Sequence, residues 1–204
     1  MFGLAYIVFF AIYLGISILV VRGTVKFARR HEKNVFLWGT VAAFIMYNLV
    51  FWDWIPTVAT HQYYCASESG FWVYKPFDQW KAENPGVMQG LVANERAPYR
   101  TERFDDGHVE THTYFLNDRF NWIVTQQDIS RFLPIIRTEQ QVKDVKNGEV
   151  LARYVNFSAG SSVKNTVGPP GPLKFWLSSS NCNGGSGNRS LFWQFTEKFN
   201  GKEK

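Results

Sequence analysis

The sequence predicts a membrane α+β protein: a two-helix transmembrane hairpin, then an extracytoplasmic domain with a short helix or two and an antiparallel sheet. Two early runs, residues 2–21 and 35–52, contain no Asp, Glu, Lys, Arg or His. The segment between them is rich in Lys and Arg, and the second half of the chain alternates β-prone runs with turn residues. We therefore expect a transmembrane unit at residues 1–56 and an α+β domain at residues 57–204.

Both charge-free runs have the length of membrane-spanning helices. Such a helix needs about 20 apolar residues to cross about 30 Å of hydrocarbon. Residues 2–21 meet this requirement, and residues 35–56 meet it if Asp53 lies among the lipid headgroups. Trp52 and Trp54 would then be anchors at the membrane interface. The alternative, a pair of buried core helices, is disfavoured by the aromatic residues at the ends of the runs.

The first run could instead be a cleaved signal peptide. A signal peptide has a basic start, an apolar core of about 7–15 residues and a small-residue cleavage site. No Lys or Arg precedes the run at residues 2–21, and residues 18–21 are Ile, Leu, Val and Val. We therefore expect a retained helix.

The segment at residues 22–34 sets the predicted orientation. Against the single acid Glu32 it carries five basic residues: Arg22, Lys26, Arg29, Arg30 and Lys33. Short loops rich in Lys and Arg remain in the cytoplasm, so both termini are expected outside it. This loop also supplies most of the formal net charge of +5. The charge is therefore a topology signal, and no nucleic-acid partner is expected.

Short elements are expected where the chain leaves the membrane. Residues 57–67 should continue as helix, with Gly70 ending it. Residues 71–74 are aromatic and β-branched, which is typical of a strand. Pro76 should open a short helix over residues 77–83.

The second half of the chain is expected to form an antiparallel sheet. The strongest signal is Asn147-Gly148, a hairpin turn sequence between strands at residues 135–145 and 149–157. Further strands are expected at residues 108–116 and 119–125, with edge strands at 173–177 and 191–195. Loops are expected at residues 93–106, 158–172 and 178–190, which are charged or rich in Gly, Ser, Asn or Pro.

Several motifs resemble an uncharacterised family of small two-helix inner-membrane proteins of Proteobacteria with a periplasmic domain. They are Trp52-Asp53-Trp54-Ile55-Pro56, Tyr64-Cys65, and the segments at residues 70–75, 79–86, 147–160 and 174–177. The resemblance implies a location in the bacterial inner membrane. With the basic loop in the cytoplasm, both termini are then periplasmic. The resemblance implies no activity.

The two cysteines, Cys65 and Cys182, both follow the second apolar run. They therefore lie in a compartment that permits disulfides. A bridge would close a loop of about 117 residues and contribute about 4–5 kcal/mol in the chain-entropy model. Redox-active pairs commonly have the form Cys-x-x-Cys, so we expect a structural bridge. The alternative is two unpaired thiols.

Candidate chemical sites are few. On a strand, His108, Glu110 and His112 would share one face as a two-His-one-carboxylate set, but the spacing is not that of H-E-x-x-H. We expect a solvated face without metal. The Gly-rich segment at residues 183–188 lacks the Gly-Lys-Ser/Thr ending of a phosphate-binding loop. We expect neither a cofactor nor enzymatic activity.

Aromatic residues make up 17% of the chain. Membrane belts and the sheet core could absorb all of them, whereas a surplus on the surface would indicate an interface. We expect a non-enzymatic accessory or assembly subunit of a larger envelope complex, acting through the periplasmic domain. Its partners would be the lipid bilayer and other envelope proteins. The alternative is a periplasmic ligand- or glycan-binding or sensing module. Exposed apolar surface would favour docking, a pocket with converging polar groups would favour ligand binding, and a buried titratable cluster would favour an enzyme.

Overall fold

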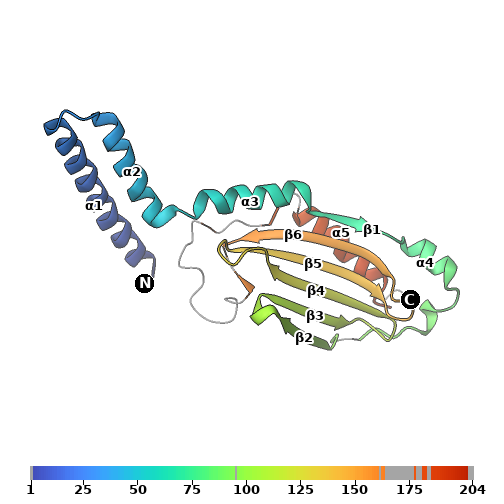
Figure 1. Cartoon of the computed structure of the whole chain (residues 1–204). Helices are drawn as coiled ribbons and strands as arrows, with labels where there is room; N and C mark the ends of the chain where they lie inside the picture. Colours follow the sequence, from blue (N-terminus) through green and yellow to red (C-terminus); the bar gives the residue numbers. More distant parts are fainter. Residues whose placement is uncertain are drawn as a thin grey trace. The chain divides into compact units, whose positions relative to one another are not determined.

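A computed structural model describes residues 2–94, 96–160, 162–163, 177, 181–182 and 185–201. The chain divides into two compact units, Met1–Ile55 and Pro56–Lys204, whose elements are drawn in Figure 1. In chain order the elements are α1 (Phe2–Arg30), α2 (Val35–Phe51), α3 (Trp54–Ser67), β1 (Gly70–Val73), α4 (Phe77–Glu83), η1 (Met88–Gly90), β2 (Tyr99–Phe104), η2 (Asp105–Gly107), β3 (Val109–Phe115), β4 (Phe120–Asp128), β5 (Ile135–Asp144), β6 (Val150–Ala159) and α5 (Gly185–Lys198).

In the first unit, α1 and α2 pack against each other. The rings of Phe10 and Phe51 stack with their centroids 6.0 Å apart, and the rings of Phe27 and Trp38 meet edge to face at 6.5 Å. The start of one helix thus meets the end of the other. Most large apolar side chains of both helices remain exposed in this unit.

The predicted boundary of the first helix is wrong. We expected residues 2–21 to be helical and residues 22–34 to form a loop, but α1 continues to Arg30. Four of the five basic residues expected in the loop lie in the last turns of α1, namely Arg22, Lys26, Arg29 and Arg30. Only Lys33 lies in the connection between the two helices. Lys and Arg are good helix formers, so the helix propagates beyond the apolar run.

One segment of the described chain, Tyr6–Arg30, is by itself long and apolar enough to cross a membrane. The second expected helix, residues 35–56, is broken. Helix α2 ends at Phe51 and α3 begins at Trp54, with a bend of 63° between the two helices. Pro56 has no N–H to bond the carbonyl four residues earlier, which favours a break here.

The second unit contains a six-stranded antiparallel sheet with the strand order β1-β6-β5-β4-β3-β2. The predicted hairpin around Asn147-Gly148 joins β5 to β6, and Gly148 has a positive φ of 73°. Glycine adopts this backbone conformation without steric cost. The predicted helix at residues 77–83 is α4.

The two faces of this sheet pack against different helices. Helix α5 lies against one face (Figure 1), where the largest buried side chains are Trp80, Phe120, Tyr154, Phe192 and Phe199. The other face carries Val155 and Phe157, which pack against Tyr64 and Cys65 of α3 and against Cys182. Neighbouring residues of a strand point to opposite faces, so the sheet separates these two clusters.

A strand was missed in the segment at residues 93–106, which we expected to be a loop. Residues Tyr99–Phe104 form β2, which pairs with β3 along its length. Its sequence is charged, but Arg103 lies opposite Glu110 and binds its carboxylate at 2.9 Å. The partner strand therefore stabilises a segment whose own composition gives no strand signal.

The expected edge strand at residues 191–195 is also wrong. These residues belong to α5, which begins at Gly185 inside the expected loop at residues 178–190. Phe192, Phe195 and Phe199 are buried at helical spacing. Packing of these side chains on the sheet stabilises the helix and outweighs the β-propensity of the aromatic residues. Of the edge strand expected at residues 173–177, residues 173–176 lie outside the described residues.

Candidate ligand pocket and disulfide cluster

A cavity of about 410 Å³ lies on the sheet face that carries α5. Its lining residues come from four strands, the segment before α5, and α5 itself: His112, Tyr114, Trp122, Val124, Gln126, Thr138, Gln140, Tyr154, Asn156, Ser158, Asn181, Arg189 and Trp193. The sheet register places these strand residues side by side; Gln126 lies opposite Thr138, for example. The cavity is therefore built by the alternation of side chains along the strands.

One wall of the pocket is aromatic. The ring of Trp122 stacks on that of Tyr114 with a centroid distance of 4.5 Å. It also meets the ring of Trp193 from α5 edge to face, again at 4.5 Å. Tyr154 lies across from this group on β6, and burial raises the pKa of its phenol, which keeps it neutral.

Two residues that line the pocket each carry a buried polar atom without a hydrogen-bond partner among the described residues. The two atoms are Oε1 of Gln140, an acceptor, and Nε1 of Trp122, a donor. The Gln140 side chain is only 7% exposed. Leaving a buried polar group unpaired costs about 1–3 kcal/mol. Both atoms belong to residues that line the cavity, so the described chain leaves one acceptor and one donor unpaired beside it.

The pocket has little charge. Arg189 is the one permanently charged residue among the described lining residues, and no carboxylate lies among them. The remaining polar lining is mostly amide and hydroxyl, from Gln126, Thr138, Asn156, Ser158 and Asn181. Nδ1 of His112 lies 2.9 Å from the Thr101 hydroxyl. Such a lining suits a ligand that is rich in hydroxyl groups.

The predicted set of His108, Glu110 and His112 is spread over separate partners. His108 precedes β3 and pairs with Asp128 at 2.8 Å. Glu110 accepts a hydrogen bond from Arg103 at 3.0 Å. His112 faces the pocket, with Nε2 3.7 Å from Glu110. That no metal binds here stays a prediction.

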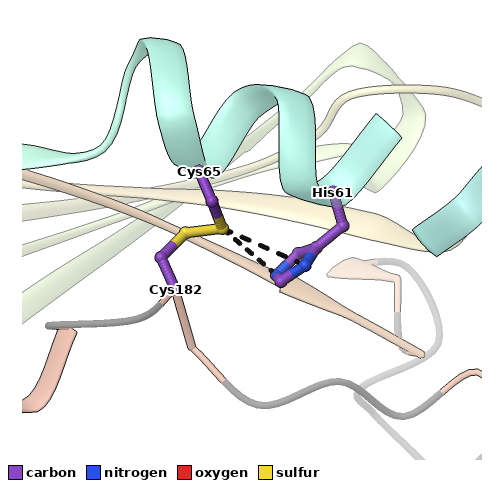
Figure 2. Close-up of side chains that lie close together, drawn as sticks. All are labelled: His61, Cys65 and Cys182. Carbon is purple, nitrogen blue, oxygen red and sulfur yellow. Dashed lines mark hydrogen bonds between the residues drawn. A yellow bond between two sulfur atoms is a disulfide. The ribbon is translucent and has the colours of Figure 1, made fainter. Parts of the chain in front are cut away.

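The expected partners Cys65 and Cys182 form a disulfide with their Cα atoms 5.3 Å apart. This lies within the range of about 4.4–6.8 Å that disulfide geometry requires. The bridge links α3 to the segment that precedes α5, and Figure 2 shows it as the bond between the two sulfur atoms. Of the expected Gly-rich loop at residues 183–188, residues 183 and 184 lie outside the described residues.

A histidine that the sequence reasoning missed lies against this disulfide. His61 is one helical turn before Cys65, and Figure 2 shows its ring directed toward the bridge. Its Nε2 and Nδ1 atoms lie 3.5 and 3.9 Å from Sγ of Cys65. In the described part of the chain, these residues with Cys182 form the one group of His, Cys, Asp or Glu side chains whose geometry could hold a metal ion. The spacing His-x-x-x-Cys in a helix could have signalled it.

Comparison with known proteins gives no relative, because no protein-family model, curated protein or solved structure matches the chain. The resemblance to two-helix inner-membrane proteins therefore remains an expectation. The pocket and the disulfide cluster are the features of the described chain that bear on function.

Proposed function

We propose that the protein is a membrane-anchored glycan-binding module whose second unit holds a carbohydrate in the pocket beneath α5. The observation that carries this proposal is the pair of unpartnered buried atoms, Oε1 of Gln140 and Nε1 of Trp122, in a cavity with an aromatic wall. This adopts the alternative expected from the sequence, because a pocket with converging polar groups was the feature that would favour it.

A carbohydrate matches the chemistry of the lining. Each hydroxyl group both donates and accepts hydrogen bonds, so neighbouring hydroxyls can satisfy Gln140 and Trp122 together. The C–H face of a sugar ring is apolar and can lie on the Tyr114–Trp122 stack. A volume of about 410 Å³ falls within the range of small-molecule pockets, roughly 300–1,000 Å³. Arg189 adds one positive charge, which favours a glycan that carries an acidic group.

We propose that α1 and α2 form a transmembrane hairpin in a bacterial inner membrane, with both termini in the periplasm. The basic end of α1 supports a cytoplasmic connection. The 17 residues of α2 extend about 25 Å, close to the thickness of the hydrocarbon core. The disulfide supports an oxidising compartment for the second unit. A reporter active only in the cytoplasm, fused after Lys204, should be silent, and strong activity would reverse the orientation.

Glycan binding can be tested on the purified full chain in detergent. Soluble peptidoglycan fragments and neutral chitin oligosaccharides would be titrated calorimetrically, and the quenching of tryptophan fluorescence would be followed in parallel. We expect binding to the wild type, and at least tenfold weaker binding by a Gln140→Leu variant. The matched control is Gln141→Leu, because Gln141 lies next to Gln140 but on the opposite face of the sheet.

Each result of this experiment bears on a different part of the proposal. If neither glycan class binds the wild type, the proposal is wrong. If Gln140→Leu and Gln141→Leu bind as tightly as the wild type, glycans bind elsewhere and the pocket assignment is wrong. A preference for the peptidoglycan fragments that is lost in an Arg189→Gln variant would assign Arg189 to an acidic group of the glycan.

A second candidate function is the docking role expected from the sequence. The observation that favours it is the edge strand β1, where Trp72 and Val73 are exposed together with the following Tyr74. An exposed edge can pair with a strand of another protein. A photo-cross-linking residue in place of Tyr74 should then capture an envelope protein, while one in place of the exposed Phe132 should not. Equal capture at both positions would remove this support. Neither role involves a catalytic step.

A further inference from the structure

We propose that reduction of the Cys65–Cys182 disulfide turns His61, Cys65 and Cys182 into a zinc-binding site. The ligand atoms of these side chains already lie within 4.8 Å of one another in the oxidised form. Figure 2 shows the three side chains close together. Thiolate and imidazole are the ligands that zinc prefers. This proposal is independent of the glycan pocket, whose lining includes none of the three residues.

The distances suit a tetrahedral site. With Zn–S of about 2.3 Å and Zn–N of about 2.0–2.1 Å, a sulfur and a nitrogen that share one zinc lie about 3.5 Å apart. Nδ1 of His61 is 3.9 Å from Sγ of Cys65. Nε2 is nearer, at 3.5 Å, but it faces the Phe157 carbonyl, so metal binding requires the ring to turn until Nδ1 comes closer to the sulfur. The two residues are one turn apart in α3, so the helix itself fixes their spacing.

The hydrogen bond of His61 leaves Nδ1 free to bind a metal. Nε2 lies 3.2 Å from the carbonyl oxygen of Phe157 on β6. A carbonyl only accepts hydrogen bonds, so we assign the ring proton to Nε2, and Nδ1 carries the lone pair. Metal-binding histidines usually donate their other N–H in this way, often to a backbone carbonyl, which fixes the ring orientation.

The site is enclosed enough that its charge balance matters. His61 and Cys182 are 6% and 5% exposed. A Zn²⁺ ion with two thiolates and a neutral imidazole has no net charge, so its burial leaves no unpaired charge behind. Three protein ligands leave the fourth tetrahedral position for water.

The conversion needs a reductant of the dithiol class. Attack by one of its thiolates opens the disulfide through a mixed disulfide. The dithiol becomes a disulfide, and Cys65 and Cys182 become thiols, having gained two electrons and two protons. Zn²⁺ then forms two Zn–S bonds and one Zn–N bond, and the two thiol protons go to solvent. In both states α3 stays linked to the segment that precedes α5.

Metal titration of the full chain in detergent tests the proposal. The protein would be reduced without oxygen, freed of reductant, and titrated with Co²⁺ as a spectroscopic substitute for Zn²⁺. We expect about one Co²⁺ per reduced chain with thiolate-to-cobalt charge-transfer absorption, displaced by Zn²⁺, and no such absorption for the oxidised chain. A His61→Ala variant should bind Zn²⁺ at least tenfold more weakly. The His108→Ala/His112→Ala double variant is the matched control and should bind like the parent.

Three results would overturn the proposal. The first is a reduced wild type that keeps its circular dichroism but shows no charge-transfer band. The second is an unchanged zinc affinity in His61→Ala. The third is a reduced wild type that loses its folded spectrum and does not recover it with Zn²⁺, because the metal would then not replace the bridge. A Cys65→Ser/Cys182→Ser variant should show no band.

Discussion

Two neighbouring polar side chains on opposite faces of the central sheet differ in their hydrogen-bond partners. On the face that packs against α3, Glu139 accepts hydrogen bonds from Arg153 and Gln141, each at 2.6 Å, and Arg137 pairs with the same carboxylate. On the α5 face, the neighbouring Gln140 has a buried oxygen without a partner. These residues are adjacent in one strand. Within the described residues, the carboxylate of Glu139 therefore has three partners, whereas the side-chain oxygen of Gln140 has none.

The largest effect is expected from removing the covalent link on the α3 face. A Cys65→Ser/Cys182→Ser variant should lose about 4–5 kcal/mol of unfolding free energy, since the bridge closes a long loop. Chemical denaturation of the second unit in the full chain measures this. A variant as stable as the parent would show that the bridge has no structural role, and the two faces would then differ only in hydrogen bonding.

The part of the α5 face around Asp144 should be nearly as sensitive to substitution, because its polar groups have hydrogen-bond partners. The fully buried Asp144 accepts hydrogen bonds from Trp80 at 3.0 Å and from Arg119 at 2.8 Å. Asp144→Ala leaves the largely buried Arg119 without a carboxylate, with Asn84 as its remaining acceptor, so we expect a loss of about 3–5 kcal/mol in denaturation. The control is Asp105→Ala, which breaks an exposed pair with Arg131 and should cost less than about 1 kcal/mol. Similar losses in both variants would contradict this assignment.

Acid should weaken both faces, through the buried Asp144 on one and the partly buried Glu139 on the other. Burial raises the pKa of Asp144, but hydrogen bonds from Arg119 and Trp80 outweigh it and hold the pKa below its usual value of 3.8. The folded-state pKa is depressed, so this stability is present above the unfolded pKa and is lost as the pH falls through the folded pKa. The pKa of Glu139 is likewise lowered, because hydrogen bonds from Arg153 and Gln141 outweigh burial.

Denaturation midpoints measured between pH 7 and pH 2 should therefore fall mainly below about pH 4. An Asp144→Asn variant, which cannot titrate at that position, should show a shallower fall. An equally steep fall would mean that Asp144 does not contribute to the acid sensitivity.

The smallest effect separates ligand binding from folding. Gln140→Leu removes an unsatisfied buried acceptor, so the unliganded variant should be as stable as the wild type or up to about 1 kcal/mol more stable. Thermal unfolding without glycan measures this. A clear destabilisation would mean that Gln140 is satisfied within the chain, and the contrast between the two faces would disappear.

Local signals predicted much of this fold. Asn147-Gly148 specifies a hairpin by its turn chemistry, and the helix at Phe77–Glu83 follows from the proline before it. The partnership of Cys65 and Cys182 followed from the compartment and from having no competing cysteine. In these cases the residues that carry the information are few and lie close to the feature.

The elements that were missed depend on contacts with other segments of the chain. The charged β2 is a strand because β3 pairs with it, and the aromatic residues of α5 became helical by packing on the sheet. The pocket needs the register of four strands, for which no short motif exists. The spacing of His61 and Cys65 is set by α3 itself, but Cys182 joins them only because α3 packs against β6 near Phe157. A local sequence pattern does not show which segments come into contact in the folded chain.

The two consecutive residues Asn181 and Cys182 connect the two faces. Asn181 lines the pocket and accepts a hydrogen bond from Asn156 at 2.5 Å, while Cys182 is bridged to α3 on the opposite side. The Cys182 backbone N–H also donates to Asn156, at 3.2 Å. By thermodynamic linkage, any free energy by which the bridge improves ligand affinity equals the free energy by which the ligand favours the bridged form. The midpoint of disulfide reduction would then shift with ligand concentration and report pocket occupancy from the far side of the sheet.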